Sequence, residues 1–235
     1  MFEGSGCIIE QKITMCERFA LYASPASLKE HFATANAPDR EPCFNIAPAQ
    51  SVLVVYIDDT GNRVFTLARW GLIPSWVKDT EELQQPSNAK AETAAINPMF
   101  RHAYRESRVL VPADAFYEWA ARDGRQPYLI RLRDAEPMGL GGLLETWHGP
   151  AGSIVTFTIL TIEANPLMAA IHDRMPVIIR PEDYAAWIDP SLNDIIRIQS
   201  MARPYPERLM EAYPVSRKID SPQYDSPDLI EPTQE

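Results

Sequence analysis

Two β-rich runs and the turn between them are the most informative stretch for the fold of this chain: Ser51-Val52-Leu53-Val54-Val55-Tyr56-Ile57, then Asp58-Asp59-Thr60-Gly61-Asn62, then Arg63-Val64-Phe65-Thr66-Leu67-Ala68-Arg69. Branched and aromatic side chains favour strands, whereas Asp, Gly and Asn favour turns. The pattern predicts an antiparallel β-hairpin.

Further short β-rich runs follow this hairpin, and helical patterns lie beside them. Ser24 and Pro25 predict the N-cap and first residue of a helix that reaches about Thr34. Many short strands without regular strand–helix alternation favour an α+β fold. We therefore predict one α+β domain with a curled, barrel-like, mixed or antiparallel β-sheet and flanking helices. The other expected strands are 108–111, 115–120, 128–133, 138–146 and 154–162, and the other expected helices are 98–105, 181–188 and 192–201.

The composition, with 46% hydrophobic and 23% charged residues over 235 positions, is that of an ordinary soluble globular protein. No apolar run has the length that a bilayer span requires. Residues 1–14 lack the basic start and apolar centre of a secretory signal. The three cysteines, Cys7, Cys16 and Cys43, show neither a disulfide framework nor metal-ligand spacing. We expect a cytoplasmic protein that needs no metal and no organic cofactor.

The net charge of −10 argues against a nucleic-acid partner, but its distribution weakens that argument. The stretch 219–235 contributes −5 and residues 1–14 contribute −1, which leaves −4 for residues 15–218. A modestly acidic body still has room for a local basic groove. We divide the chain into an extension (1–14), a domain (15–218) and an acidic tail (219–235) that we expect to be poorly ordered.

Cys16, in the run Met15-Cys16-Glu17-Arg18-Phe19, is the leading candidate nucleophile. If translation begins at Met15 and that Met is removed, or if the segment before Cys16 is cleaved, the mature chain starts with cysteine. We expect residues 1–14 to be absent from the mature chain for one of these reasons. The α-amine and thiol of such a residue titrate near about 8 and 8.5, so both are partly reactive at neutral pH. Together they can close a thiazolidine ring on an aldehyde carbon. The alternative is a buried structural thiol.

Glu118 and His172 are the candidate proton-transfer groups. In an alternating strand, Glu118 shares a face with Phe116 and Ala120, where burial makes a carboxylate hold its proton more tightly. His172, in Ile171-His172-Asp173-Arg174-Met175-Pro176, titrates near neutral pH. The alternatives are an exposed strand Glu and a structural His that is hydrogen-bonded in a turn.

Two polar or aromatic stretches supply candidate binding residues. In Pro86-Ser87-Asn88-Ala89-Lys90, the Asn88 amide can hydrogen-bond at a reactive centre and Lys90 can meet a phosphate, although Ser87 or Asn88 could instead cap a helix. Trp70 and Trp76 flank a Gly/Pro turn and could stack bases, although core packing is the more common use of Trp.

These motifs, taken in their order along the chain, resemble the SOS response-associated peptidase (SRAP) family of abasic site processing proteins. The resemblance runs from Met15 to about Val215. The motifs that carry it are Met15-Cys16-x-Arg18-Phe19, Phe44-Asn45-Ile46-Ala47-Pro48, Trp70-Gly71-Leu72-Ile73-Pro74-Ser75-Trp76, Asn88-Ala89-x-x-Glu92-Thr93, Phe116-Tyr117-Glu118-Trp119, Ile171-His172-Asp173-Arg174-Met175-Pro176 and Pro214-Val215-Ser216.

The resemblance implies a sensor of abasic sites in single-stranded DNA or at single–double-strand junctions. Cys16 would form a Schiff base and then a thiazolidine with the open-chain sugar aldehyde, giving a covalent DNA–protein crosslink. Autoproteolytic removal of the residues before Cys16 and a lyase activity are implied as well. The family pattern assigns catalysis to Cys16, Asn88, Glu118 and His172, the substrate pocket to Thr161 and Asn45, and DNA contacts to Arg18, Trp70, Lys90 and Arg174. We expect a monomer that associates with the nucleoid at damage.

Two other function classes fit some of the same residues. A thiol peptidase or amidase would use Cys16 with His172 and would ignore DNA aldehydes. A DNA-binding module without chemistry would bind equally well after Cys16→Ala and would form no covalent species.

Overall fold

The predicted hairpin forms part of a closed sheet. The computed structural model describes residues 17–37, 40–80, 83–120, 125–150 and 152–233. In it, β3 (Ser51–Ile57) pairs antiparallel with β4 (Arg63–Trp70) along its whole length. Gly61 closes the turn with a φ of +81°, a conformation that glycine adopts without strain, and its N–H donates to the carbonyl of Asp58 at 2.9 Å.

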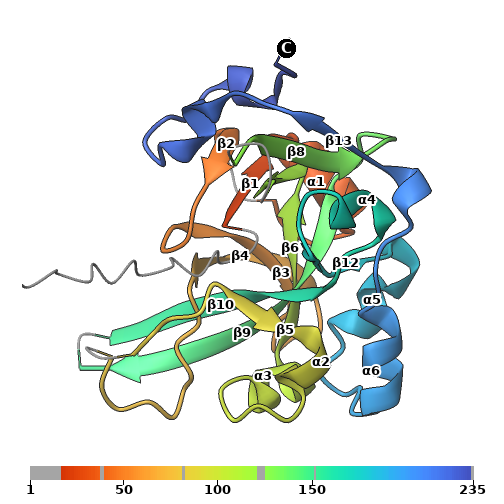
Figure 1. The fold of residues 1–235 in the computed structure, drawn as a ribbon. Coiled ribbons are helices and arrows are strands. Elements are labelled where there is room, and N and C mark those ends of the chain that lie inside the picture. The colour runs from red at the N-terminus through yellow and green to blue at the C-terminus, as the bar shows by residue number, and fades with distance from the viewer. Residues whose placement is uncertain (1–16, 38–39, 81–82, 121–124, 151, 234–235) are drawn as a thin grey trace, which may run out of the picture.

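Three more strands complete a five-stranded barrel, namely β6 (Arg108–Ala113), β9 (Met138–Gly149) and β10 (Gly152–Glu163). β3 pairs with β6, β6 with β9, and β9 with β10, all antiparallel. β10 then pairs in parallel with the end of β4, which closes the ring. The expected α+β fold with a barrel-like mixed sheet is confirmed (Figure 1).

Short strands extend this sheet on both edges of the end of β10 and beside β9. β5 (Asn88–Lys90) runs parallel to β10, and β11 (Arg174–Pro176) pairs antiparallel with the end of β10. β12 (Ile178–Ile179) pairs with β9. The sequence analysis missed all three strands, because two or three residues carry too little periodicity to predict a strand.

A second, antiparallel sheet has the strand order β13, β8, β7, β1, β2. Alternation along β7 places Phe116 and Ala120 in the main hydrophobic core, which both sheets share, and Tyr117 in a smaller cluster. The face assignment made from the sequence is therefore confirmed. The strands are β1 (Arg18–Leu21), β2 (Cys43–Ile46), β7 (Ala115–Trp119), β8 (Pro127–Leu132) and β13 (Met210–Pro214).

Short helices flank the two sheets, and the predicted cap is present. Ser24 accepts a hydrogen bond from the N–H of Ser27 at 3.2 Å, and Pro25 is the first helical residue. None of the helices in the described part of the chain is long and apolar enough to cross a membrane. The α-helices are α1 (Pro25–His31), α2 (Ala91–Ala94), α3 (Arg101–Glu106), α4 (Pro166–Ala169), α5 (Tyr184–Trp187) and α6 (Ile195–Met201); the 3₁₀ helices are η1 (Pro181–Asp183), η2 (Glu207–Leu209), η3 (Arg217–Asp220) and η4 (Pro227–Ile230).

The acidic tail corrects an expectation, because residues 219–233 are folded against the outer face of the second sheet. Ile219 and Leu229 are fully buried there, together with Tyr117 and Leu129. In Figure 1 the segment lies across β2, β8 and β13. The prediction of a poorly ordered tail is wrong for these residues, because three spaced apolar side chains (Val215, Ile219 and Leu229) find a common cluster despite the charge around them.

Candidate functional site

The pairing around the end of β10 brings together residues that lie far apart in the sequence. β5 runs beside β10 with Asn88 opposite Ile159 and Lys90 opposite Thr161. On the other edge, the start of β11 places Arg174 opposite Glu163. Five of the predicted site residues therefore come from one region: Asn88, Lys90, Thr161, His172 and Arg174.

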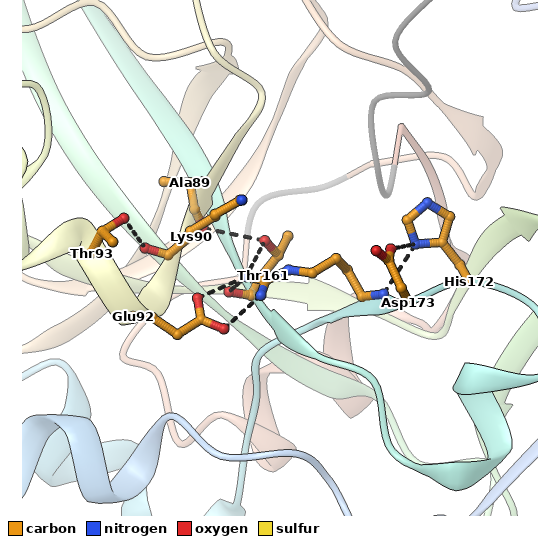
Figure 2. A network of polar contacts seen from close by, with 8 residues as sticks. Ala89, Lys90, Glu92, Thr93, Thr161, His172 and Asp173 are labelled. Carbon is orange, nitrogen blue, oxygen red and sulfur yellow. Dashed lines mark hydrogen bonds and ion pairs between the residues drawn. The ribbon is translucent and has the colours of Figure 1, made fainter.

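Arg174 is the centre of a hydrogen-bond network that Figure 2 shows from close by. Its Nη1 and Nη2 contact the two carboxylate oxygens of Glu92 at 2.5 and 2.8 Å. Nη2 also donates to the carbonyl oxygen of Thr161 at 2.7 Å and to its Oγ1 at 3.2 Å. A planar guanidinium suits such bidentate contacts. Burial is the largest single influence on the Glu92 pKa and raises it, but the hydrogen bond and charge of Arg174 together with backbone hydrogen bonds outweigh burial, and the pKa is lowered.

His172 is mostly buried, with a side chain 12% exposed, and its Nδ1 has two neighbours. The N–H of Arg174 donates to Nδ1 at 3.1 Å, and Oδ1 of Asp173 lies 3.0 Å from the same atom. One nitrogen cannot accept and donate at once, so these contacts belong to the neutral and the protonated ring respectively. Burial lowers the pKa of His172 despite the nearby carboxylate of Asp173, which favours the neutral ring. That ring carries its proton on Nε2. The hydrogen-bonded turn considered from the sequence is present as well.

Asn88 and Lys90 both lie on β5, and neither Ser87 nor Asn88 occupies the N-cap position of the helix that follows. α2 begins at Ala91 after a Lys90 N-cap that makes no side-chain cap hydrogen bond. The helix-capping alternative for Ser87 and Asn88 is therefore excluded. Asn88 is half-buried, and its Nδ2 donates to Oγ of Ser87 at 3.3 Å. The Lys90 side chain is exposed, so its ammonium is open to an anionic partner.

Glu118 and Arg18 come from the second sheet, on the neighbouring strands β7 and β1. Glu118 is 1% exposed, so the exposed-strand alternative is wrong and the expected desolvated carboxylate is present. Arg18 pairs with Tyr117 across the ladder, and its Nη1 donates to the carbonyl of Glu17 at 2.7 Å. Burial lowers the pKa of Arg18, but a guanidinium remains a cation at neutral pH.

The two indoles of the Trp70–Trp76 stretch have opposite environments. Trp70 is 1% exposed, so the prediction that it lines a DNA path is wrong; its ring packs inside the core. Trp76 is 61% exposed. The adjoining backbone is fixed, because the N–H of Ser75 donates to Oε2 of Glu145 at 3.2 Å and Nε1 of Trp147 donates to the carbonyl of Val77 at 2.7 Å.

Asn45 belongs to another part of the molecule. Its Nδ2 donates to the carbonyls of Ser221 at 2.9 Å and Tyr224 at 2.8 Å, and the residue is 1% exposed. It holds the C-terminal segment on the second sheet. The prediction that it lines a substrate pocket is therefore wrong for this structure, because its amide donors are engaged with the protein backbone.

Cys16, the predicted nucleophile, lies outside the described residues. β1 begins two positions later at Arg18 and pairs with β7, the strand that carries Glu118. Within the described residues, no group of three or more His, Cys, Asp or Glu side chains is arranged to hold a metal ion.

Comparison with known proteins decides the family. The sequence profile of the SOS response associated peptidase (SRAP) family matches residues 15–222. The chain belongs to this family. Among its SRAP relatives, "Abasic site processing protein YoqW" of Bacillus subtilis (strain 168) is 40% identical over 223 residues, which are 92% of this chain and 99% of the relative. "Abasic site processing protein YedK" of Escherichia coli (strain K12) is 27% identical over 93% of this chain and 100% of its own.

A solved structure agrees with the SRAP fold described above. A crystal structure of a Bacteroides thetaiotaomicron protein superposes with a TM-score of 0.83 at 23% identity, covering 93% of this chain and 100% of that one. At this identity the likeness supports the fold alone.

From the sequence, Glu92 received no role, and Trp70 rather than Trp76 was predicted to contact DNA. Glu92 and Arg174 are 82 positions apart, and no local pattern predicts that two such residues form an ion pair. Nor does a local pattern predict which of Trp70 and Trp76 is buried, since burial depends on which strands pair.

Proposed function

We propose that this SRAP protein captures abasic sites in single-stranded DNA by a covalent bond from Cys16. The observation that carries the proposal is the buried carboxylate of Glu118 on the strand next to β1, in a chain whose similar relatives are named abasic site processing proteins. In the sequence Cys16 lies two positions before Arg18, the first residue of β1.

The proposed reaction has two steps and releases one water. First, the α-amine of Cys16 adds to the sugar aldehyde, and loss of water gives a Schiff base. Then the sulfur bonds to the imine carbon while the thiol proton moves to the nitrogen, which closes the thiazolidine. Each step needs a proton donor or acceptor, and Glu118 and His172 are the proposed groups. The Schiff base is also the proposed intermediate of a lyase activity.

The other site residues take supporting roles in this proposal. Asn88 holds the N-terminal residue and the sugar, and Thr161, opposite Lys90 on β10, lines the same pocket. Arg18, Lys90 and Arg174 meet phosphates, and Lys90 is the exposed one. Because an abasic site offers no base to read, binding depends on salt and shows little sequence preference. Trp76 replaces Trp70 as the proposed surface for base stacking, since its ring is exposed and its loop is held in place.

The proposal requires a free α-amine on Cys16, so residues 1–15 are absent from the active form. The test mixes single-stranded DNA carrying one abasic site with three proteins: a chain beginning at Cys16, the chain 1–235, and the shorter chain with Cys16→Ala. Denaturing gels and intact mass then report the product. We expect a crosslink of protein plus DNA minus one water from the first protein only, unless the longer chain removes its own extension.

Two controls make this experiment specific. Cys43→Ala removes another thiol, half-buried and with a pKa raised by burial, and should leave the crosslink unchanged. DNA whose abasic aldehyde has been reduced to an alcohol should give no crosslink. A band that survives Cys16→Ala, or no band from the chain beginning at Cys16, would contradict the proposal. Hydrolysis of peptides without any DNA adduct would favour the thiol peptidase instead.

A further inference from the structure

The Trp70 side chain contacts residues of both sheets of the molecule. Its ring packs edge-on against Phe19 of β1, with centroids 5.2 Å apart. On its other side it stacks on Phe157 of β10, with centroids 6.2 Å apart and planes 12° from parallel. β1 belongs to the second sheet and β10 to the barrel. The indole therefore fixes the spacing between strands that carry different parts of the site.

The polar end of the same indole holds the residue before Asn88. Nε1 of Trp70 donates to the carbonyl oxygen of Ser87 at 2.8 Å. That oxygen also accepts from the N–H of Ile159 at 3.0 Å. A carbonyl oxygen has two lone pairs, so both are used. The backbone entering β5 is thus tied to both β4 and β10 immediately before Asn88.

From this geometry we infer that Trp70 is a positioning residue for Asn88. It touches no substrate, since its ring is buried. It acts by fixing Ser87, to which Asn88 is bonded covalently and through Nδ2 to Oγ at 3.3 Å. Loss of the N–H donor leaves the Ser87 carbonyl with one partner and removes the attachment of the segment before β5 to β4. A displacement of about 1 Å in a reacting group can cost about 100-fold in rate. For the loss of one of two anchors we expect about tenfold.

A matched control separates positioning from general core packing. Trp187 on α5 is also fully buried, and its Nε1 donates to the carbonyl of Val109 at 2.9 Å. Trp70→Phe and Trp187→Phe therefore remove the same group, an indole N–H on a buried backbone carbonyl, and both shrink a core ring. Only Trp70 contacts the segment that leads to Asn88.

The catalytic test rests on the proposed function and compares these variants at a temperature where thermal unfolding shows both to be folded. Trp70→Phe should slow single-turnover crosslinking by about tenfold while its affinity for intact single-stranded DNA stays within about twofold. For Trp187→Phe, the crosslinking rate and the DNA affinity should both stay within about twofold of those of the unsubstituted chain. In a double-mutant cycle, Trp70→Phe should have little further effect on a chain that carries Asn88→Ala, because both act on the same group. Equal slowing by the two Trp variants, or additive effects with Asn88→Ala, would overturn the inference.

A second readout needs no DNA chemistry. The side-chain amide NMR signals of Asn88, assigned by their loss in Asn88→Ala, should shift in Trp70→Phe and stay in place in Trp187→Phe. Should Trp70→Phe fail to fold, 3-benzothienylalanine at position 70 keeps the ring shape and removes only the N–H. If the unsubstituted chain forms no crosslink, the proposed function fails, and the Asn88 signals still decide the positioning role. Unchanged Asn88 signals in the position-70 variant would refute it.

Discussion

Replacing Glu92 by Gln should strengthen DNA binding and make it more salt-sensitive. In the free protein the Glu92 carboxylate accepts hydrogen bonds from both terminal nitrogens of Arg174, so the pair carries no net charge. A phosphate that approaches Arg174 meets this carboxylate as a competitor. Gln keeps the size of the side chain and one acceptor oxygen, so Arg174 stays supported while the negative charge is lost.

The expected magnitude follows from one additional uncompensated cation. For single strands, each neutralised phosphate adds about 0.7 to the slope of log K against log salt. Between 50 and 200 mM salt, the affinity of Glu92→Gln should therefore fall about 2.6-fold more than that of the unsubstituted chain. The stability cost is small, because the Glu92 side chain is 43% exposed, and such ion pairs contribute about 1 kcal/mol or less.

Fluorescence anisotropy with abasic and intact oligonucleotides over a salt series provides the measurement. Glu182→Gln is the matched control, because it removes one carboxylate from another Arg–Glu pair, with Arg180 at 3.8 Å, on an element that carries no site residue. An equal change in both variants would show that the effect comes from the change in net charge and not from the release of Arg174. An unchanged slope with equal or weaker affinity in Glu92→Gln would refute a role for Arg174 at the phosphates.

Four further predictions address the other parts of the molecule. Glu118→Gln keeps the buried shape but cannot exchange a proton, so single-turnover crosslinking should slow by about 10²- to 10⁴-fold with DNA affinity retained, and a change under twofold would exclude it from proton transfer. Trp76→Ala should weaken binding of single strands by about 5- to 150-fold, the equivalent of about 1–3 kcal/mol for one lost base stack, whereas Leu67→Ala, another exposed apolar change, should not. The lowered pKa of His172 predicts an NMR titration midpoint below the ordinary 6.5. The contribution of neutral His172 to stability is complete above pH 6.5 and is lost as the pH falls through the folded-state pKa. A midpoint above 6.5 would contradict the burial argument. Leu229→Ala should lower the free energy of unfolding by about 2–5 kcal/mol in urea titrations, against a small change for the exposed Leu209→Ala, and equal effects would show that the C-terminal segment is not part of the core.

Local chemistry made part of this structure predictable from the sequence. The turn around Gly61, the cap at Ser24 and the alternation along β7 are each set by residues within a few positions of one another. The burial of Glu118 followed from the same alternation, because its neighbours Phe116 and Ala120 are apolar. Such features depend on backbone preferences that a short segment already has.

Pairings between distant segments account for most of what the sequence did not predict. β5 has three residues, and only its place beside β10 makes it a strand. The burial of Trp70 and the exposure of Trp76 follow from where β1 and β10 lie, not from the residues around each indole. The prediction for the acidic tail failed for a related reason. The charge of the tail indicates disorder, but Leu229 is buried in a cluster with Tyr117, which belongs to a distant part of the chain.

The arrangement explains how very short strands can hold reactive groups in place. β5 and β11 are each three residues long, and both use the last residues of β10 as their partner. Thr161 lies where they meet, and its carbonyl and hydroxyl oxygens both accept from Arg174. Trp70 of β4 adds a second attachment for the segment that enters β5. Positions set by several independent contacts lose little entropy when a substrate binds, which is what the proposed capture of an aldehyde would require of Asn88 and His172. The weaker point is β11, where the Arg174–Glu92 pair is partly exposed, and we therefore expect DNA to perturb that side of the site most.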